Sequence, residues 1–267
     1  MKNIVQLFTA ALIILSLAVL SYSQAQGELS SPGFRIKPGI LFEYFDRTVT
    51  WDDDEQESQL QSMFIVLDTG FQTRGGFSLH AILGYSLSNF DALVFRELPF
   101  SVELDVGRIE GFVLGAEVEK GLFSTGSMEI GIFGQILYNK VKQKTWDIPG
   151  LSVEGTVTGK PSWIRASAGP VFKYTGFDAF DPYARVCYNK LWGTFEMEQT
   201  IPDPEGIENQ DLEGMEEKDI KAKSQFDATL GTLFHLNRAF SLKGEVHLMP
   251  YDGGVDIGFL FGAFLSF

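Results

Sequence analysis

Apolar and polar residues alternate along most of the chain with a period of two. Near the C-terminus Val255, Ile257, Phe259 and Phe261 occupy one face, which stays apolar to the last residue, Phe267. The residues between them, on the other face, are a mixture of small, polar and apolar types. Successive side chains of a β-strand point to opposite faces, so this segment predicts a strand with one fully apolar face.

The same alternation recurs often enough to predict a complete fold. It appears at 33–50, 60–73, 76–88, 108–122, 127–142, 160–175, 180–197, 222–236, 239–249 and 255–267. Short connections near 73–76, 123–126, 176–179 and 237–239 alternate with long polar ones at 51–59, 89–107, 143–159 and 198–221, then a shorter one at 250–254. Transmembrane barrels sort their connections in this way, whereas soluble β-sandwiches have no reason to. The pattern predicts an all-β fold: a single antiparallel up-and-down transmembrane β-barrel of ten strands, with eight or twelve as alternatives.

The alternative of twelve strands comes from segment 89–107. It contains two short apolar stretches, 92–98 and 101–106, on either side of Pro99 and Phe100. A membrane-spanning strand needs about 9–11 residues, and these stretches are shorter. We therefore predict an outer hairpin there.

Aromatic residues give an independent indication of the membrane boundary. Tyr44, Tyr85, Tyr138 and Tyr188 lie on the apolar face near the ends of strands that lead into long connections. From Phe34 to Tyr44 the strand rises by about 33 Å, or ~25 Å once tilted. That matches the apolar band of an outer-membrane barrel, so the four tyrosines are predicted to form an aromatic girdle.

The N-terminus has the pattern of an export signal. Lys2 precedes a mostly apolar stretch from Ile4 to Leu20, and Ser23-Gln24-Ala25 has the small-x-small form of a cleavage site. We predict a signal peptide over 1–25 and a barrel domain over 26–267.

Composition excludes several classes of function. The 267 residues carry 21 Lys and Arg against 35 Asp and Glu, a net charge of −14, which argues against nucleic-acid binding. One cysteine and three histidines cannot build a Cys/His zinc framework. No cofactor is expected.

The leader, the succession of amphipathic strands and the aromatic final strand together resemble small Gram-negative outer-membrane β-barrel proteins of the porin-like superfamily. In that group an aromatic C-terminal strand is the signal read by the barrel-assembly machinery. The resemblance implies that the corresponding signal here consists of Phe259, Phe261, Leu265 and Phe267. The resemblance implies insertion in the outer membrane and contact with its lipids and lipopolysaccharide. It implies no particular activity.

If the apolar face meets lipid, the other face lines a lumen rich in charge. The predicted lumen residues are Arg35, Lys37, Glu43, Asp68, Glu117, Glu129, Arg165, Lys173, Arg185, Asp227, Lys243, Glu245 and Asp256. The signs are nearly balanced, and a ten-stranded barrel is narrow, so the charges can pair and fill the lumen. The alternative is a narrow polar conduit. Cys187 is expected to be an inert inward thiol.

An enzymatic alternative rests on His247, Asp256 and Glu245. With a turn at 250–253, His247 faces Asp256 across the last two strands, and a carboxylate beside a histidine is the material of general base catalysis. Ten strands is also the number in the omptin proteases, but no omptin residue matches by position. We therefore predict a salt-bridged rim histidine and no enzyme.

Two connections hold much of the negative charge. Segments 51–59 and 198–221 contain fourteen of the 35 acidic residues, among them Asp52, Asp53 and Asp54. The simplest expectation is a solvated, partly disordered acidic tip. The alternatives are weak Ca²⁺ binding by Asp52 to Asp54, divalent cations that bridge to lipopolysaccharide, or a basic partner.

For the whole chain, the sequence predicts a non-enzymatic integral outer-membrane barrel. Its role would be structural, a surface interaction, or slow passage of small polar solutes. A narrow channel or transporter and an outer-membrane hydrolase, omptin-like or lipid-modifying, are the alternatives.

Overall fold

The computed structural model describes residues 34–51, 56–73, 75–91, 93–95, 98, 102–104, 106–148, 155–202 and 212–266. The predicted leader over 1–25, the acidic residues Asp52, Asp53 and Asp54, and Phe267 lie outside them. Every regular element within these residues is a β-strand. In this part of the chain no helix is long and apolar enough to cross a membrane.

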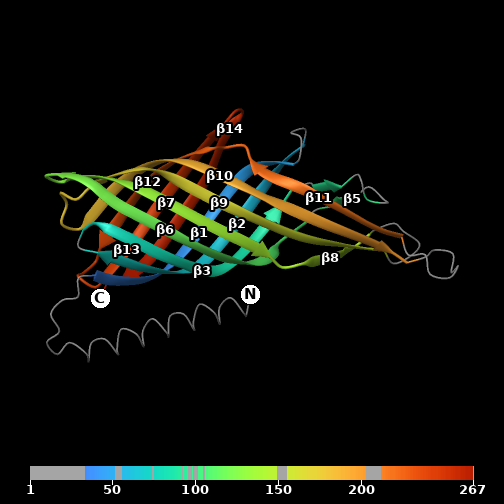
Figure 1. Ribbon diagram of the computed structural model, residues 1–267, viewed down its shortest axis with the longest axis horizontal. Helices are drawn as coiled ribbons and strands as arrows, with labels where there is room; N and C mark the ends of the chain where they lie inside the picture. Colours follow the sequence, from blue (N-terminus) through green and yellow to red (C-terminus); the bar gives the residue numbers. More distant parts are fainter. Residues whose placement is uncertain are drawn as a thin grey trace, which may run out of the picture. The chain divides into compact units, whose positions relative to one another are not determined.

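Ten of the described strands form a closed antiparallel ring (Figure 1). In ring order they are β1 (Phe34–Trp51), β2 (Gln56–Thr73), β3 (Phe77–Phe90), β6 (Ile109–Thr125), β7 (Met128–Val141), β9 (Thr156–Tyr174), β10 (Phe180–Ile201), β12 (Phe226–His235), β13 (Phe240–Tyr251) and β14 (Gly254–Leu265). The ring closes where residues 39–46 of β1 pair with 257–264 of β14. The predicted ten-stranded up-and-down barrel is confirmed, and most strand boundaries fall within a few residues of those predicted.

The short connections all lie at one end of the barrel, called the lower end below. They join β2 to β3, β6 to β7, β9 to β10 and β12 to β13. Two of them contain glycines with positive φ, Gly76 at 71° and Gly126 at 59°. Residues with a Cβ rarely adopt this conformation, so glycine permits these tight reversals.

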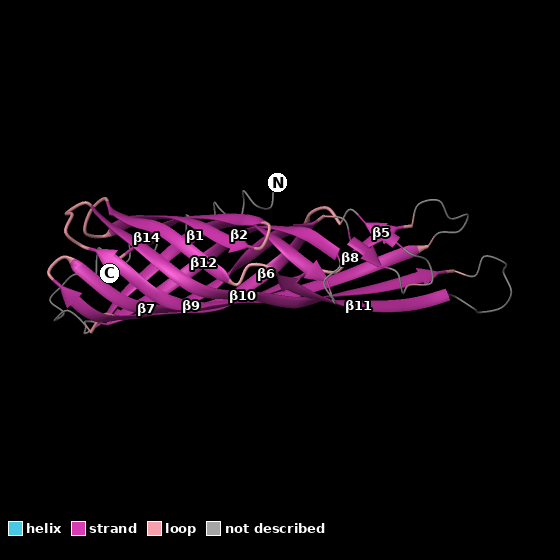
Figure 2. Cartoon of the chain, turned by 90° about the horizontal axis from the view of Figure 1, so that it is seen from above, coloured by secondary structure: helices cyan, strands magenta, loops and turns pink. Residues whose placement is uncertain are grey.

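The upper end carries further β-structure that the ring does not include. It comprises β4 (Leu93–Phe95), β5 (Val102–Leu104), β8 (Lys144–Asp147) and β11 (Leu212–Ala222). Figure 2 shows β5, β8 and β11 gathered at this end. Strands β4 and β5 pair only with each other, as the outer hairpin predicted in 89–107.

The prediction for 198–221 is wrong for its described part. Strand β10 continues to Ile201, and β11 pairs with its upper half from Trp192 and then with the end of β1. The charges misled because the acidic residues dominate the composition of this segment: Glu217 and Asp219 are exposed, while Ile220 is fully buried and Glu216 is 7% exposed. Here it is exposure, and not charge, that alternates with the period of two of a strand.

The polarity of the two faces reverses along the ring strands. On β10 the outward Val186 and Tyr188 are about half exposed, while the inward Arg185 is 4% exposed. Higher on the same strand, Glu196 faces outward and Phe195 is fully buried inside. The lower barrel is thus apolar outside and polar inside, as lipid requires, and the upper barrel is the reverse, as water requires. The change occurs at the level of Tyr188.

Candidate functional site in the barrel lumen

Glu245 on β13 is the centre of the polar lumen. It is 3% exposed and accepts hydrogen bonds from Tyr183 and Arg185, which alternate along β10. Lys243 Nζ lies 3.0 Å from the same carboxylate oxygen. Gly231 on the intervening strand leaves room for Tyr183, since a Cβ there would lie 2.4 Å from the ring carbon Cζ. A buried carboxylate is tolerated only with such matched and hydrogen-bonded partners.

His247 extends this network upward. Its Nε2 lies 3.2 Å from Glu245 Oε2, and its Nδ1 lies 3.0 Å from Asp227 Oδ2. The Thr229 hydroxyl donates to the other oxygen of Asp227 at 3.0 Å. Both ring nitrogens of His247 therefore already have carboxylate partners.

The predicted pairing of His247 with Asp256 is wrong. The β13–β14 turn is formed by residues 252–253, one residue later than predicted, so His247 pairs with Gly258 and Met249 pairs with Asp256. The carboxylates beside His247 are Glu245, which was predicted, and Asp227, which the sequence placed only in the general lumen set.

Asp256 has a different environment, at the junction of three strands. Its Oδ2 accepts the Thr48 backbone N–H at 3.0 Å, and its Oδ1 accepts the Thr48 hydroxyl at 2.9 Å. Here β1 changes partner, from β14 up to Asp46 to β11 from Val49. Asp256 thus supplies the acceptor for a backbone donor between two ladders.

A second set of bonds crosses the lumen at the next level. Arg165 on β9 binds Glu43 on β1 through two hydrogen bonds, of 2.5 and 3.0 Å. Arg165 also donates to Gln135 at 3.3 Å, and the amide of Gln135 donates to Glu117 at 2.9 Å. Four strands are joined in this way through the middle of the barrel. A gap of about 20 Å³ between the two sets has room for about one water molecule.

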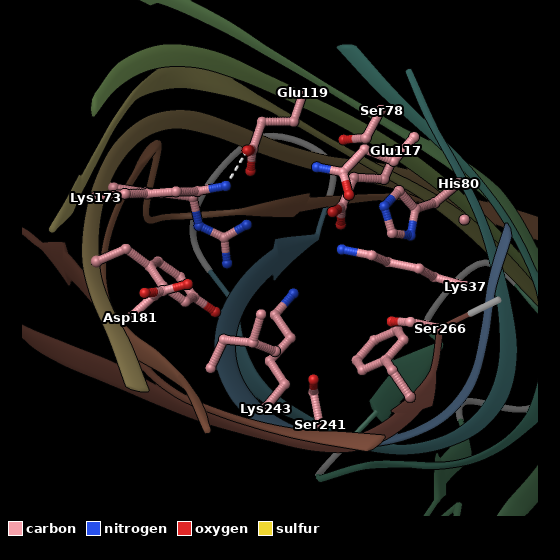
Figure 3. A pocket seen from close by; sticks show the side chains of 16 residues that line it. Lys37, Ser78, His80, Glu117, Glu119, Lys173, Asp181, Ser241, Lys243 and Ser266 are labelled. Carbon is pink, nitrogen blue, oxygen red and sulfur yellow. Dashed lines mark hydrogen bonds and ion pairs between the residues drawn. The ribbon is translucent and has the colours of Figure 1, made fainter. Parts of the chain in front are cut away.

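The lower end of the lumen is less tightly filled. Lys173 forms an ion pair with Glu119, and His80 Nδ1 lies 2.7 Å from Asp68. Arg35 is exposed at this end. Glu129 lies opposite Lys173 in the β7–β9 pairing. A cavity of about 140 Å³ opens here, with Lys37, Lys173 and Lys243 among its lining residues (Figure 3).

Above the polar network the lumen is filled by aromatic and aliphatic side chains. Phe90 is the centre, with ring centroids 5.5 Å from Trp51, 5.8 Å from Trp163 and 5.6 Å from Phe195. All four side chains are at most 3% exposed. We call these four residues the aromatic plug. Val49, Leu60, Val113, Val157, Met197 and Ile220 belong to the same cluster of buried side chains.

The aromatic plug was not predicted, although its pattern is present in the sequence. The alternation in β10 continues past Tyr188 with the apolar side chains on the inward face, at Leu191, Phe195 and Met197. A search for the lipid-facing stripe alone does not register this reversal.

Arg47 is a second residue that sequence analysis missed. It is fully buried, donates to Asn189 at 2.9 Å and donates to the backbone carbonyl of Ser224 at 2.8 Å. Its position follows from the period of two that begins at Glu43. Asn189 in turn donates to Asp227 at 3.3 Å, which connects Arg47 to the bonds around Glu245.

The structure also places the residues predicted to face the membrane. Tyr138 and Tyr188 are 40% and 49% exposed on the outer surface, and Tyr44 and Tyr85 are half-buried there. On the last strand Phe259 and Phe261 are exposed. Leu265, predicted on the same face, is instead buried opposite Phe240, where the chain end bonds to the β12–β13 turn through Ser266 N–H and the Ala239 carbonyl.

The exterior of the upper barrel carries ion pairs. Lys160 Nζ lies 2.6 Å from Glu198 and 3.3 Å from Glu196. The hydrogen bond between Lys160 and Glu198 raises the pKa of Lys160 and lowers the pKa of Glu198. Among the described residues no group of three or more His, Cys, Asp or Glu side chains could hold a metal ion. Cys187 is free and buried.

A closed antiparallel ring with an apolar outer band and polar, paired charges inside is the architecture by which β-strands cross a bilayer. The chain is therefore an outer-membrane β-barrel protein. Its class is defined by the barrel and its lumen.

Comparisons with known proteins add no narrower identity. No family model matches the chain, and no curated protein matches it. Among solved structures it is similar to the outer-membrane protease OmpT from Escherichia coli (8% identity, 90% of this chain and 98% of that one, TM-score 0.44). It is also similar to the beta domain of the Bordetella autotransporter BrkA (13%, 88% and 99%, TM-score 0.41). A third likeness is to Ail of Yersinia pestis in complex with the heparin analogue sucrose octasulfate (13%, 87% and 99%, TM-score 0.30). At these identities and TM-scores the likenesses carry no argument about activity.

Proposed function

We propose that this chain is a non-conducting outer-membrane barrel. Its role would lie in contacts made by the rigid β-structure at its upper end rather than in transport or catalysis. The observation that carries the proposal is the aromatic plug. Four large rings at most 3% exposed fill the lumen directly above a network of hydrogen-bonded charges, so a hydrated ion has no continuous path.

The upper end supports a role in surface contact. Strands β10 and β11 pair over ten residue positions above the tyrosine level, which gives a rigid ribbon in place of a mobile loop. Its outward residues include Glu196, Glu198, Glu217 and Asp219. Lys160 pairs with Glu196 and Glu198, and Lys221 pairs with Asp219, but these four acids still outnumber the two lysines. Such a face favours a basic partner, or divalent cations that bridge it to anionic lipopolysaccharide. The lower outer face would contact lipid acyl chains.

His247 supports a non-catalytic protein. Its two ring nitrogens are bonded to Asp227 and Glu245, so neither is free to take up a proton from a substrate. It also lies below the aromatic plug, which closes the route from outside the cell. We infer that it holds the two carboxylates in place. We expect that neither the wild type nor His247→Gln hydrolyses peptides or lipid A. If the wild type does hydrolyse them and His247→Gln does not, the inference is contradicted.

Conductance in planar bilayers tests the proposal. Purified barrel, shown to be folded by heat-modifiable mobility on gels, is added to a bilayer in concentrated KCl. We expect no current steps above the baseline. Discrete steps whose size changes when Arg185 or Phe90 is replaced by Ala would show an open lumen and would overturn the proposal.

A further inference from the structure

The cavity at the lower end of the lumen is a blind pocket. It measures about 140 Å³, and Tyr183, Arg185 and Lys243 line its inner side, where they converge on Glu245. The aromatic plug closes the lumen further up. A molecule in this pocket must therefore enter and leave at the end that carries the short turns. One water needs about 10–15 Å³ of such space, so the pocket has room for a small polyatomic ion or several waters.

Three lysines reach into this pocket from three sides of the wall, Lys37 from β1, Lys173 from β9 and Lys243 from β13 (Figure 3). Lys173 pairs with Glu119, and Lys243 lies 3.0 Å from Glu245. Lys37 differs from both. Within the described part of the chain its ammonium group has neither an ion pair nor a hydrogen bond, although its side chain extends into the lumen.

The carboxylates that line the pocket have other partners. Glu117 accepts a hydrogen bond from Gln135, and Asp181 lies 2.8 Å from His235 Nε2. Glu119 is held by Lys173. The carboxylates that line the pocket therefore each contact a group other than Lys37.

Hydroxyl groups complete the lining. Ser78, Ser241 and Ser266 come from three different strands or strand ends and line the same cavity, and the Ser241 hydroxyl also lies 3.2 Å from His235 Nδ1. A hydroxyl can donate to an oxyanion, and an ammonium group that is partly withdrawn from water gains a strong charge-assisted bond from one. The lining thus offers an unpaired cation and neutral donors around a space of a few atoms.

We propose that the lower pocket binds a small oxyanion, a phosphate or carboxylate group, with Lys37 as its principal charge partner. The ligand would be held by Lys37 and the serine hydroxyls and would enter from the side of the short turns. This site is independent of the surface role proposed above, since it lies at the other end of the barrel.

Inorganic phosphate is the probe that tests the site. Calorimetric titration of the folded barrel, in a detergent without phosphate, should show one saturable site per chain. Lys37→Gln should weaken binding at least about tenfold, the size of one lost charge-assisted bond. Arg35→Gln removes the same charge two residues away on the same face, at an exposed position, and should change the affinity less than about twofold.

Each other outcome counts against the site. Absence of saturable phosphate binding to the wild type would overturn the proposal. So would binding that Lys37→Gln leaves unchanged, or binding that both substitutions weaken equally, since that would be a general effect of charge. Heat-modifiable mobility of both variants shows that any loss is not a failure to fold.

Discussion

At the scale of the residue, the lumen is built from charges that depend on one another. Arg165 and Glu43 are both buried and joined by two hydrogen bonds from opposite sides of the barrel. The sequence identified both, because the period of two puts them on the face opposite the apolar stripe. It could not identify them as partners, because β1 and β9 come to face each other across the lumen only when the ring closes.

Replacing one member of this pair should be costly. Glu43→Met leaves Arg165 buried without its carboxylate, and we expect the free energy of unfolding to fall by about 3–5 kcal/mol. Adding Arg165→Met should restore much of that loss, because no unpaired charge remains. Urea unfolding in detergent, followed by tryptophan fluorescence, measures both.

The exposed pair Lys142 and Glu110 is the matched control. Its atoms lie 3.1 Å apart on the outside, and Glu110→Met should cost less than about 1 kcal/mol. Equal losses at Glu43 and Glu110, or a double Glu43 and Arg165 variant that loses the sum of the two single effects, would contradict a coupled buried pair.

At the scale of the element, strands were predictable where the apolar residues alternate on the outward face. They were not predictable where the apolar residues move to the inward face. The ten ring strands follow from one stripe of apolar residues each. Strand β11 was missed because acidic residues dominate the composition of 198–221 and its apolar residues fall on both faces: Ile220 is buried, whereas Met215 is 67% exposed. The partner of His247 was missed because the register of β13 against β14 depends on which residues form the turn between them. When the turn moves by one residue, the residue opposite His247 moves by two.

Strand β11 gives a test at this scale. Its pairing with β10 predicts slow amide exchange between Leu212 and Ala222, whereas a disordered tip would exchange at once. Ile220→Asp puts a charge in the buried position and should remove this protection while the ring strands keep theirs. Lys221→Asp, at the adjacent exposed position, should leave it intact. Fast exchange of β11 in the wild type would refute the ordered ribbon.

At the scale of the whole barrel, the lumen changes character from one end to the other. A polar pocket at the lower end leads to a paired charge network, and this leads to the aromatic plug. Outside, the sequence of surfaces is reversed, from apolar below the tyrosine level to charged above it. The two reversals occur together because the same strands pass from lipid into water, where an apolar core must be inside.

The most direct test of that boundary is a labelling scan along β10. In a Cys187→Ser background, single cysteines replace the outward residues Ala184, Val186, Thr194 and Glu196 in turn, and the barrel is reconstituted in lipid vesicles. A membrane-impermeant maleimide should label positions 194 and 196 readily and leave 184 and 186 unlabelled until detergent is added. Equal labelling at all four positions would mean that lipid does not cover the lower barrel, and would contradict the account.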